Sequence, residues 1–424
     1  MADRSVPTTT AKVEPTEAPL TFWQRMFAAL SYRNYRLWFM GQLVSLVGTW
    51  MQMTAQGFLV FELTRSTAYL GYVGFAAGIP SWLFMLYAGV IADRVAARSL
   101  MVITQSIMMI LALILAALTF AGLVQPWHIV LLALALGTAN AFDAPARQTF
   151  VVELVERKDL TNAIALNASM FNLGSVVGPT VAGLTYAAFG AAWCFALNGV
   201  SFVAVIIALL LMRLQPRTVV QRTRSALAEL KEGVRYTLGH PLLPALIALP
   251  GVTALFGSAY GTLLPAWAVE VLGGNATTNG LLQSARGIGS LAGALAIAAL
   301  AHRGGRGRWL TTATFVYPVL LLGFSGVRVV PLALALLVGV GLSGILIFNM
   351  ANTLVQSHVS DQLRGRVMSI YTLTFFGGMP LGALWSGALA QFIGAPLTIV
   401  VSSLLSLLCA AFFWLRVPHL RELA

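Results

Sequence analysis

The sequence predicts an all-α membrane protein whose twelve transmembrane helices form two six-helix repeats. Hydrophobic residues make up 58% of the 424 residues and charged residues only 9%, whereas a soluble domain contains about 25% charged residues. Of the 26 Lys and Arg residues, all but Arg65, Arg286 and Arg328 lie in the two tails or in every second gap between long apolar runs. Basic loops stay on the cytoplasmic side of a bilayer, because their transfer costs free energy and anionic lipids attract them.

Each apolar run is long enough to cross a bilayer, since about 20 helical residues span the hydrocarbon core and a helix satisfies its own backbone groups. The runs lie near 36–62, 69–91, 99–122, 127–144, 160–187, 191–212, 243–270, 279–301, 309–326, 331–350, 365–391 and 395–415. The basic gaps follow the even-numbered runs. We therefore expect a multi-pass protein of the cytoplasmic membrane with both termini in the cytoplasm.

The longest gap divides the chain in two. We expect a cytoplasmic tail, a six-helix bundle, a cytoplasmic linker, a second bundle and a C-terminal tail, over residues 1–30, 31–213, 214–242, 243–416 and 417–424. Within the linker, apolar residues recur at helical spacing, at Leu227, Leu230, Val234 and Leu238. This pattern predicts either an amphipathic helix on the inner membrane face or a solvated linker.

The two halves of the chain resemble each other. Gly183-Leu-Thr-Tyr-Ala-Ala-Phe-Gly190 aligns with Gly387-Ala-Leu-Ala-Gln-Phe-Ile-Gly394. Gly71 and Gly78 align with Gly280 and Gly287, and Asp93-Arg94 with His302-Arg303. Such a repeat predicts an interface between the halves near the middle of the membrane, where transporters place their substrate.

Polar residues form a stripe along the first run. Their spacing of three and four residues places them on one helical face, and they are Gln42, Ser45, Thr49, Gln52 and Gln56. A lipid-facing stripe of amides costs free energy, so the stripe faces protein or water. We expect these residues to line a substrate cavity; the alternative is hydrogen bonding between helices, which is common in membranes.

The eighth run repeats the pattern with Asn279, Gln283, Arg286 and Ser290. A guanidinium inside a span usually faces a cavity or a partner. In one interpretation Gln283 and Arg286 line the cavity and Arg286 attracts an anionic group of the substrate. In the other, Arg286 forms a structural pair with Glu270 or Glu62.

Asn140, Asp143 and Arg147 share a face at the inner end of the fourth run. A buried carboxylate can carry a proton, so Asp143, Arg147 and Glu62 are the candidates for proton coupling. The alternative for Asp143 and Arg147 is a charge pair at a helix end. Weaker polar faces occur in the tenth run and the seventh run, and they comprise Asn349, Asn352 and Gln356, and Thr253 and Tyr260.

No pattern in the sequence indicates catalysis, so we do not expect an enzyme. The five histidines are scattered, no nucleophile has an evident base, and no phosphate-binding loop is present. We expect no cofactor, no metal site and no disulfide between Cys194 and Cys409. The net charge of +12 is spread along one membrane face, which argues against nucleic acid as a partner. The expected partners are membrane lipid, a small-molecule substrate and the proton, and we expect a monomer.

Gly89-Val-Ile-Ala-Asp93-Arg94-Val-Ala-Ala-Arg98 resembles the signature between helices 2 and 3 of the major facilitator superfamily. That resemblance implies the major facilitator fold and assigns Gly89, Asp93, Arg94 and Arg98 to a gate on the cytoplasmic side. Gly174-Ser-Val-Val-Gly178-Pro179-Thr-Val-Ala-Gly183 resembles the helix 5 signature of proton-coupled exporters. An ordinary seam of small residues accounts for its packing but not for its spacing.

More narrowly, the chain resembles the enterobactin-exporter-like branch of drug and siderophore exporters. The segments that carry this resemblance are Arg33-Asn-Tyr-Arg-Leu-Trp-Phe-Met-Gly-Gln-Leu-Val-Ser45, Gly48-Thr-Trp-Met-Gln52, Phe61-Glu-Leu-Thr64, Asp143-Ala-Pro-Ala-Arg147 and Leu363-Arg-Gly-Arg-Val367. One departure is Ala133, which stands where the exporters' helix 4 signature has an Arg four residues before a Gly, here Gly137.

The resemblance implies a secondary active transporter that works by alternating access and exports a small amphipathic or anionic compound in exchange for protons. A lipid or nutrient transporter of the same fold is an alternative. A membrane scaffold or receptor that transports nothing is another.

Overall fold

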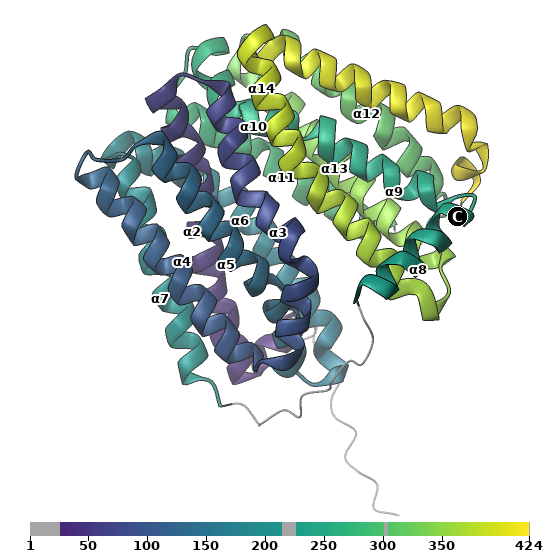
Figure 1. Cartoon of the computed structure of the whole chain (residues 1–424), viewed down its shortest axis with the longest axis horizontal. Helices are drawn as coiled ribbons and strands as arrows, with labels where there is room; N and C mark the ends of the chain where they lie inside the picture. Colours follow the sequence, from purple (N-terminus) through teal and green to yellow (C-terminus); the bar gives the residue numbers. More distant parts are fainter. Residues whose placement is uncertain (1–25, 214–225, 301–303, 424) are drawn as a thin grey trace, which may run out of the picture.

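A computed structural model describes residues 26–213, 226–300 and 304–423, and these residues form helices and no strands. Two groups of helices lie side by side (Figure 1). The first group, here called the N-half, contains α2 to α7. Their bounds are Arg33–Thr64, Thr67–Arg94, Ala97–Phe120, Pro126–Glu153, Leu160–Phe189 and Ala191–Leu211. Two short 3₁₀ turns accompany them, η1 (Ala28–Ser31) and η2 (Arg157–Asp159).

The second group, the C-half, begins with a rod that alternates between α-helical and π-helical segments. The rod comprises α9 (Leu243–Val252), η3 (Thr253–Gly257), α10 (Ala259–Ala266) and η4 (Trp267–Val271). The other helices are α11 (Ala276–Leu300), α12 (Arg306–Gly326), α13 (Val330–His358) and α14 (Asp361–Arg416). α14 turns back on itself at Gly394, whose φ of 79° is a conformation that favours glycine.

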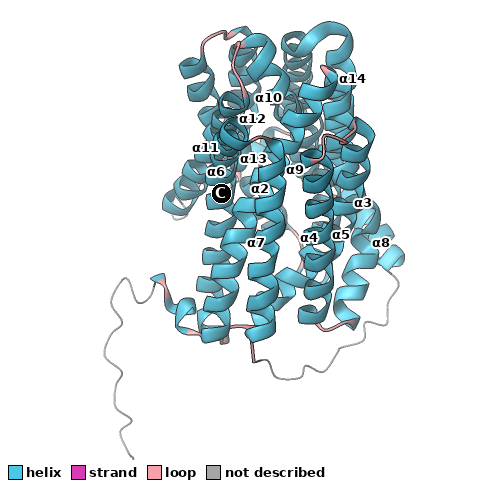
Figure 2. Ribbon diagram, turned by 90° about the vertical axis from the view of Figure 1, so that its left-hand side faces the viewer, coloured by secondary structure: helices cyan, strands magenta, loops and turns pink. Residues whose placement is uncertain are grey.

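Eight of the helical segments are long and apolar enough to cross a membrane, on length and composition alone. They are α4, α5, α7, the rod over 243–271, α11, α12, α13 and α14. α2, α3 and α6 are similarly long, with 32, 28 and 30 residues. The helices run roughly along one common direction (Figure 2). The protein is therefore a multi-pass membrane protein.

We call the end where α7 leaves and α8 enters the linker end, and the opposite end the distal end (Figures 1 and 2). The core of the C-half is one cluster of buried apolar residues from α9 to η5 (Pro418–Glu422). The N-half has one main cluster toward each end. Only the distal cluster includes residues of the C-half, namely Ala266 and Val269. The halves therefore share a core at the distal end, whereas Figure 1 shows their ribbons diverging toward the linker end.

Residues of both predicted tails pack against the helices. Ala29, within the segment that the sequence assigns to the N-terminal tail, is fully buried in the N-half core. Its backbone N–H donates to Asn162 Oδ1 at 2.9 Å. At the other terminus, Leu420 lies in the C-half core, and the carbonyl of Leu423 accepts from the backbone N–H of Gly307 at 3.1 Å. Residues 1–25 and 424 lie outside the described residues.

The linker contains one helix, α8 (Ala226–Gly239), which packs against α14. Glu232 forms an ion pair with Arg366, and Gly233 lies against Arg366 as well. Leu238 is 72% exposed. The side chains of Leu227 and Leu230 lie outside the described residues, so the apolar face predicted from the sequence is described only in part. These contacts tie α8 to the C-half.

His240, between α8 and α9, should make the linker end sensitive to acid. Burial lowers the pKa of His240 below its usual 6.5, and the charge of His358 lowers it further. His240 Nδ1 accepts a hydrogen bond from the backbone N–H of Leu242 at 3.2 Å, which a protonated ring cannot accept. Because the folded protein favours the neutral ring, this contribution is complete above pH 6.5 and is lost as the pH falls through the folded-state pKa.

We therefore expect the melting temperature to fall on acidification more in the parent protein than in His240→Asn, which keeps an acceptor that does not titrate. Differential scanning fluorimetry well above and well below pH 6.5 measures both. His419→Asn, at an exposed position, is the control. Equal acid sensitivity in the parent and His240→Asn would contradict the prediction.

Candidate functional site

Two helix seams join the halves, α3 against α14 and α6 against α11. Glycines allow close approach in both seams. A Cβ at Gly71 would lie 2.8 Å from the carbonyl oxygen of Ala383, and one at Gly287 would lie 2.6 Å from that of Ser175. A Cβ at Gly280 would overlap the carbonyl oxygen of Pro179. Ser175 and Pro179 of the exporter signature therefore lie at the contact between the halves.

The glycines and the proline of that signature pack on two different neighbours, one in each half. Gly174 and Gly178 pack against Trp50 of α2, within the N-half. Pro179 and Gly183 pack against α11, where Gly183 lies next to Thr277. Adjacent turns of α6 thus pack against its own half and against the facing half.

Hydroxyl groups tie both seams near the distal end. Thr67 Oγ1 donates to the carbonyl oxygen of Gly387 at 3.1 Å, and Thr277 Oγ1 donates to that of Gly183 at 3.3 Å. Gly183 and Gly387 are equivalent in the repeat, and the two threonines lie at the beginnings of the equivalent helices α11 and α3. Deeper in the second seam, Ser284 Oγ donates to the carbonyl of Val176 at 2.6 Å. Among the described residues, the hydrogen bonds that cross between the halves lie in the distal half of the molecule.

The predicted gate lies at the linker end. A Cβ at Gly89 would meet nothing within 4 Å, and Arg94 is exposed at the end of α3. Arg98 donates to the carbonyl oxygen of Leu210 in α7 at 2.9 Å, within its own half. The side chain of Asp93 lies outside the described residues. A role for these residues in closing the linker end stays a prediction.

Arg286 lies where the halves meet. Its guanidinium carbon is 6.0 Å from the centre of the Trp50 ring of α2, and the side chain also interacts with the hydroxyl of Tyr260 in α10. Among the described residues no carboxylate lies within 4.0 Å of it. The two carboxylates that the sequence offers as partners lie elsewhere: Glu62 accepts a hydrogen bond from Tyr186, and Glu270 is exposed and attracted by Arg65. Arg286 is therefore a half-buried cation surrounded by aromatic side chains.

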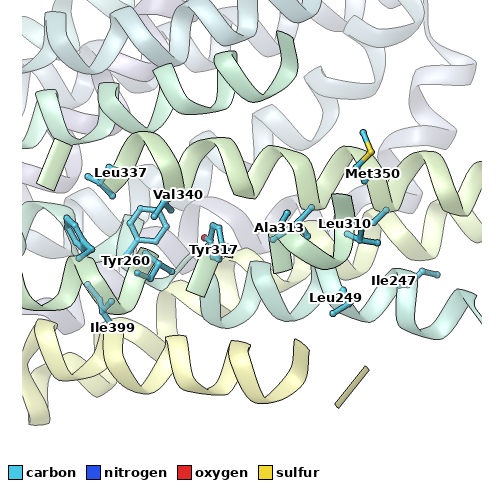
Figure 3. Packing of buried hydrophobic residues seen from close by; sticks show 14 of the residues in the cluster. Ile247, Leu249, Tyr260, Leu310, Ala313, Tyr317, Leu337, Val340, Met350 and Ile399 are labelled. Carbon is cyan, nitrogen blue, oxygen red and sulfur yellow. The ribbon is translucent and has the colours of Figure 1, made fainter. Parts of the chain in front are cut away.

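Tyr260 and Tyr317 form the inner wall of this region. Both are buried in the C-half core, their hydroxyls interact with each other, and Figure 3 shows them side by side. The backbone positions the group closely: Tyr260 lies between the two π-helical segments, which often occur at functional sites, and Gly341 of α13 lies directly against the carbonyl of Arg286.

Sequence reasoning missed Trp50 and Tyr317. Each is a single aromatic residue within an apolar run, and such residues are common in cores and at lipid-facing surfaces. The available signal for Trp50 is that it directly follows Thr49, a residue of the polar stripe. No comparable signal exists for Tyr317.

The amide stripe of α2 divides into two parts. Gln52 Oε1 accepts from Asn198 Nδ2 of α7 at 2.7 Å, and Gln56 Nε2 donates to the carbonyl of Ile129 in α5 at 3.4 Å. These two amides bond neighbouring helices of the N-half, as the alternative interpretation expects. Gln42 and Ser45 are buried, whereas Thr49 and Gln283 are half-buried. Cavity lining stays a prediction for the stripe and for Gln283.

Asp143 is buried between α5 and α4, with 1% of its surface exposed. Its Oδ1 accepts from Thr104 Oγ1 at 2.8 Å and from Gln105 Nε2 at 3.1 Å. Arg147 Nε lies 3.7 Å from Oδ2. The Asp143 carboxylate thus points into the N-half, toward α4, and not toward the C-half. A role in coupling stays a prediction for Asp143, Arg147 and Glu62.

Comparison with known proteins identifies the protein family. The family model of transmembrane secretion effectors matches residues 24–424. The chain is 23% identical to the staphyloferrin A transporter of Staphylococcus aureus, over 89% of this chain and 95% of that one. It is 28% identical to the multidrug efflux pump Tap of Mycolicibacterium fortuitum (89% and 93%). It is 27% identical to the enterobactin exporter EntS of Citrobacter koseri (88% of each).

Solved structures share the fold. The nucleoside transporter NupG superimposes with a TM-score of 0.74 at 15% identity, over 90% of this chain and 98% of that one. A bacterial homolog of the lysosomal transporter Spinster, in an inward-facing and unoccupied conformation, gives 0.69 at 16% identity, over 91% and 97%. The proteins of this family are membrane transporters and not enzymes. With its multi-pass helical fold and a family match over almost its whole length, the chain belongs to the transmembrane secretion effectors of the major facilitator superfamily.

Proposed function

We propose that this protein is a proton-coupled exporter of a small amphipathic or anionic compound and works as a monomer by alternating access. The observation that carries the proposal is Arg286, a cation at the contact between the halves with no carboxylate within 4.0 Å among the described residues. A cation within a membrane span needs a counter-charge. An anionic group of the substrate supplies it, and Trp50 offers a flat apolar surface next to it.

The topology of the proposal has twelve spans. To the eight segments that are apolar enough by themselves, we add α2, α3 and α6 and count the two limbs of α14 separately. The positive-inside rule places the linker end and both termini in the cytoplasm. In this arrangement the halves are joined on the outer side, which supports an inward-facing state.

Transport in sealed vesicles tests the function. Purified protein in proteoliposomes with an imposed pH gradient is offered fluorescein, a flat organic anion, and ethidium, a flat cation. We expect proton-driven movement of fluorescein. Arg286→Gln should reduce it by about tenfold to a hundredfold, because a hydrogen bond to a charged group contributes about 1.5–3 kcal/mol and 1.4 kcal/mol is a factor of ten. Arg286→Lys should retain part of the activity, since the charge remains but the planar fork is lost.

Four results would count against the proposal. Parent vesicles that move neither probe favour a scaffold or receptor. Parent vesicles that move ethidium and not fluorescein contradict anion recognition. Arg286→Gln protein that is less abundant and less stable, but equally active per folded molecule, assigns Arg286 a structural role. Movement in the inward direction would favour a nutrient transporter of the same fold.

A further inference from the structure

α3 and α11 are equivalent helices of the internal repeat, and both begin at the distal end. α3 starts at Thr67, and α11 starts 209 residues later, at Ala276. The same shift relates Gly71 to Gly280, the glycines through which these two helices contact the facing half. The starts of α3 and α11 can therefore be compared residue by residue.

The first turn of a helix needs hydrogen-bond acceptors, because its first backbone N–H groups have no partner within the helix. The residue before the helix, the N-cap, commonly supplies one through its side chain. α11 follows this rule, since Asn275 Oδ1 accepts from the backbone N–H groups of Thr277 at 3.0 Å and Thr278 at 3.3 Å. The Thr278 hydroxyl in turn accepts from the N–H of Asn275 at 3.4 Å. α11 is thus capped by its own half.

α3 is capped by the other half. Its N-cap is Ser66, the counterpart of Asn275, and the Ser66 backbone has the extended conformation of an N-cap, with φ −119° and ψ 124°. Among the described residues, however, the Ser66 hydroxyl makes no bond to the first turn; it donates to Gln391 Oε1 of α14 at 2.7 Å. The same Oε1 accepts, more weakly, from the backbone N–H of Ala68 at 3.5 Å. A serine N-cap binds this N–H group or the next one, so an amide of the C-half takes the place of the serine.

The second seam has no such amide. Gly183 and Gly387 are equivalent in the repeat, 204 residues apart, and each packs against the first turns of the facing helix. One turn beyond Gly387 lies Gln391, and one turn beyond Gly183 lies Ala187, which has no polar side-chain atom. Of these two described helix starts, only that of α3 therefore takes a side-chain acceptor from the other half.

Separation of the halves at the distal end removes Gln391 from α3. Gln391 is exposed, so water can bind its amide once it has left. The Ser66 hydroxyl then has no partner in the C-half. Rotation about a single side-chain bond brings it to the N–H groups of the first turn, where Asn275 already lies in α11. Because the Ser66 backbone has the N-cap conformation in the closed state, this exchange needs no rearrangement of the chain.

We propose that Ser66, Ala68 and Gln391 form a distal gate in which two caps alternate. Gln391 caps α3 while the distal end is closed, and Ser66 replaces it when the halves separate there. The exchange keeps opening easy, because the first turn of α3 has an acceptor in both states. The inference rests on the alternating access proposed above. It assigns control of the distal opening to the seam of α3 and α14, and not to the seam of α6 and α11.

Ser66→Ala distinguishes alternating caps from a simple hydrogen-bonded latch. Without the serine, Gln391 is the only cap of α3, so the first turn is capped only while the halves are joined. We expect the open population to fall by about twofold to tenfold, the size of effect that loss of an N-cap has. A simple latch predicts a larger open population, since Ser66→Ala would then weaken the closed state alone. Addition of Gln391→Ala should cancel the fall, because α3 then has no cap in either state.

Electron paramagnetic resonance measures the open population. Spin labels are attached to Leu123→Cys and Val329→Cys, in distal loops of the N-half and the C-half, in protein without Cys194 and Cys409. Both positions are exposed, at 63% and 57%. Double electron–electron resonance in lipid nanodiscs gives the distribution of distances between the labels. Asn275→Ala is the matched control: it removes the cap of α11 in both states, so the distribution should stay like that of the parent.

Three results would overturn the alternating caps. The first is an open population that rises in Ser66→Ala, the second is a fall that Gln391→Ala does not cancel, and the third is an equal fall in Asn275→Ala. A parent distribution with a single distance, in the presence and absence of a bound probe, contradicts alternating access itself.

Melting temperatures test the shared cap without reference to the open state. Ser66→Ala and Gln391→Ala each leave one cap on the closed molecule, so we expect each to melt close to the parent. The double variant should melt lower than the two single effects predict, because it leaves the start of α3 uncapped. Strictly additive effects would contradict the exchange of caps, even in a protein that transports as proposed.

Discussion

Gly280→Ala should reduce transport by about fivefold or more while leaving the amount of folded protein unchanged. A Cβ at Gly280 would overlap the carbonyl oxygen of Pro179 and lie 3.2 Å from the backbone of Gly183. Backbone atoms cannot turn aside as a side chain can, so the seam between α6 and α11 has to widen. Overpacking of this kind costs about 1–3 kcal/mol, or roughly a factor of 5–150 in the population of the state with the distal end closed. Each half keeps its own core, so folding is spared.

Gly57→Ala is the matched control. Gly57 also faces the other half, but a Cβ there would lie 3.6 Å from the Pro265 side chain, an ordinary contact. Transport is measured in vesicles, and the distal end is probed by the reaction of an Ala68→Cys thiol in protein without Cys194 and Cys409. We expect faster labelling in Gly280→Ala and parent-like labelling in Gly57→Ala. Parent-like labelling and transport in Gly280→Ala would show that the seam tolerates widening.

Gly341→Ala should have the opposite profile, a loss of folded protein. Gly341 packs within the C-half, where a Cβ would overlap the carbonyl oxygen of Arg286 and lie 3.0 Å from the backbone nitrogen of Ser290. These atoms belong to α11, which Gly287 also presses against α6. Because α11 and α13 pack against each other within the C-half core, they cannot separate without disturbing that core. The strain therefore falls on the C-half core, and we expect a clear drop in melting temperature and membrane yield.

Fluorescence-detected size exclusion after heating measures both quantities. Gly326→Ala, near the end of α12, is the control, because a Cβ there meets nothing within 4 Å. Any Gly341→Ala protein that survives should also transport poorly, since the substitution displaces the backbone that carries Arg286. A yield and melting temperature equal to those of the Gly326→Ala control would refute the packing argument.

The class and location of the helices could be predicted from the sequence because both follow from local chemistry. The run at 191–212, for example, corresponds to α7 at Ala191–Leu211, since hydropathy and an adjacent glycine define its ends. The superfamily predicted from the loop signature is confirmed by the family match. These features depend on neighbouring residues in the chain, and a single sequence contains them.

The candidate site was predictable only in outline. Periodicity places Gln52 and Gln56 on one face of α2, but it cannot tell which helices that face meets, and the structure shows hydrogen bonds within the N-half. For Arg286, the sequence gives the position and the need for a counter-charge, but not Trp50 and Tyr317 as neighbours. Those contacts join residues from distant parts of the chain, so their geometry arises only from the folded arrangement.

The threonine ties at the distal end bear on how easily the molecule changes state. They are uncharged, and none of the ion pairs found among the described residues crosses from one half to the other. Each such bond contributes about 0.5–1.5 kcal/mol net. When these hydrogen bonds break, the hydroxyl and carbonyl groups can form hydrogen bonds with water instead. The closure at the distal end is thus held by weak hydrogen bonds, and a substrate that binds one state only modestly better than the other suffices to shift the equilibrium between the states.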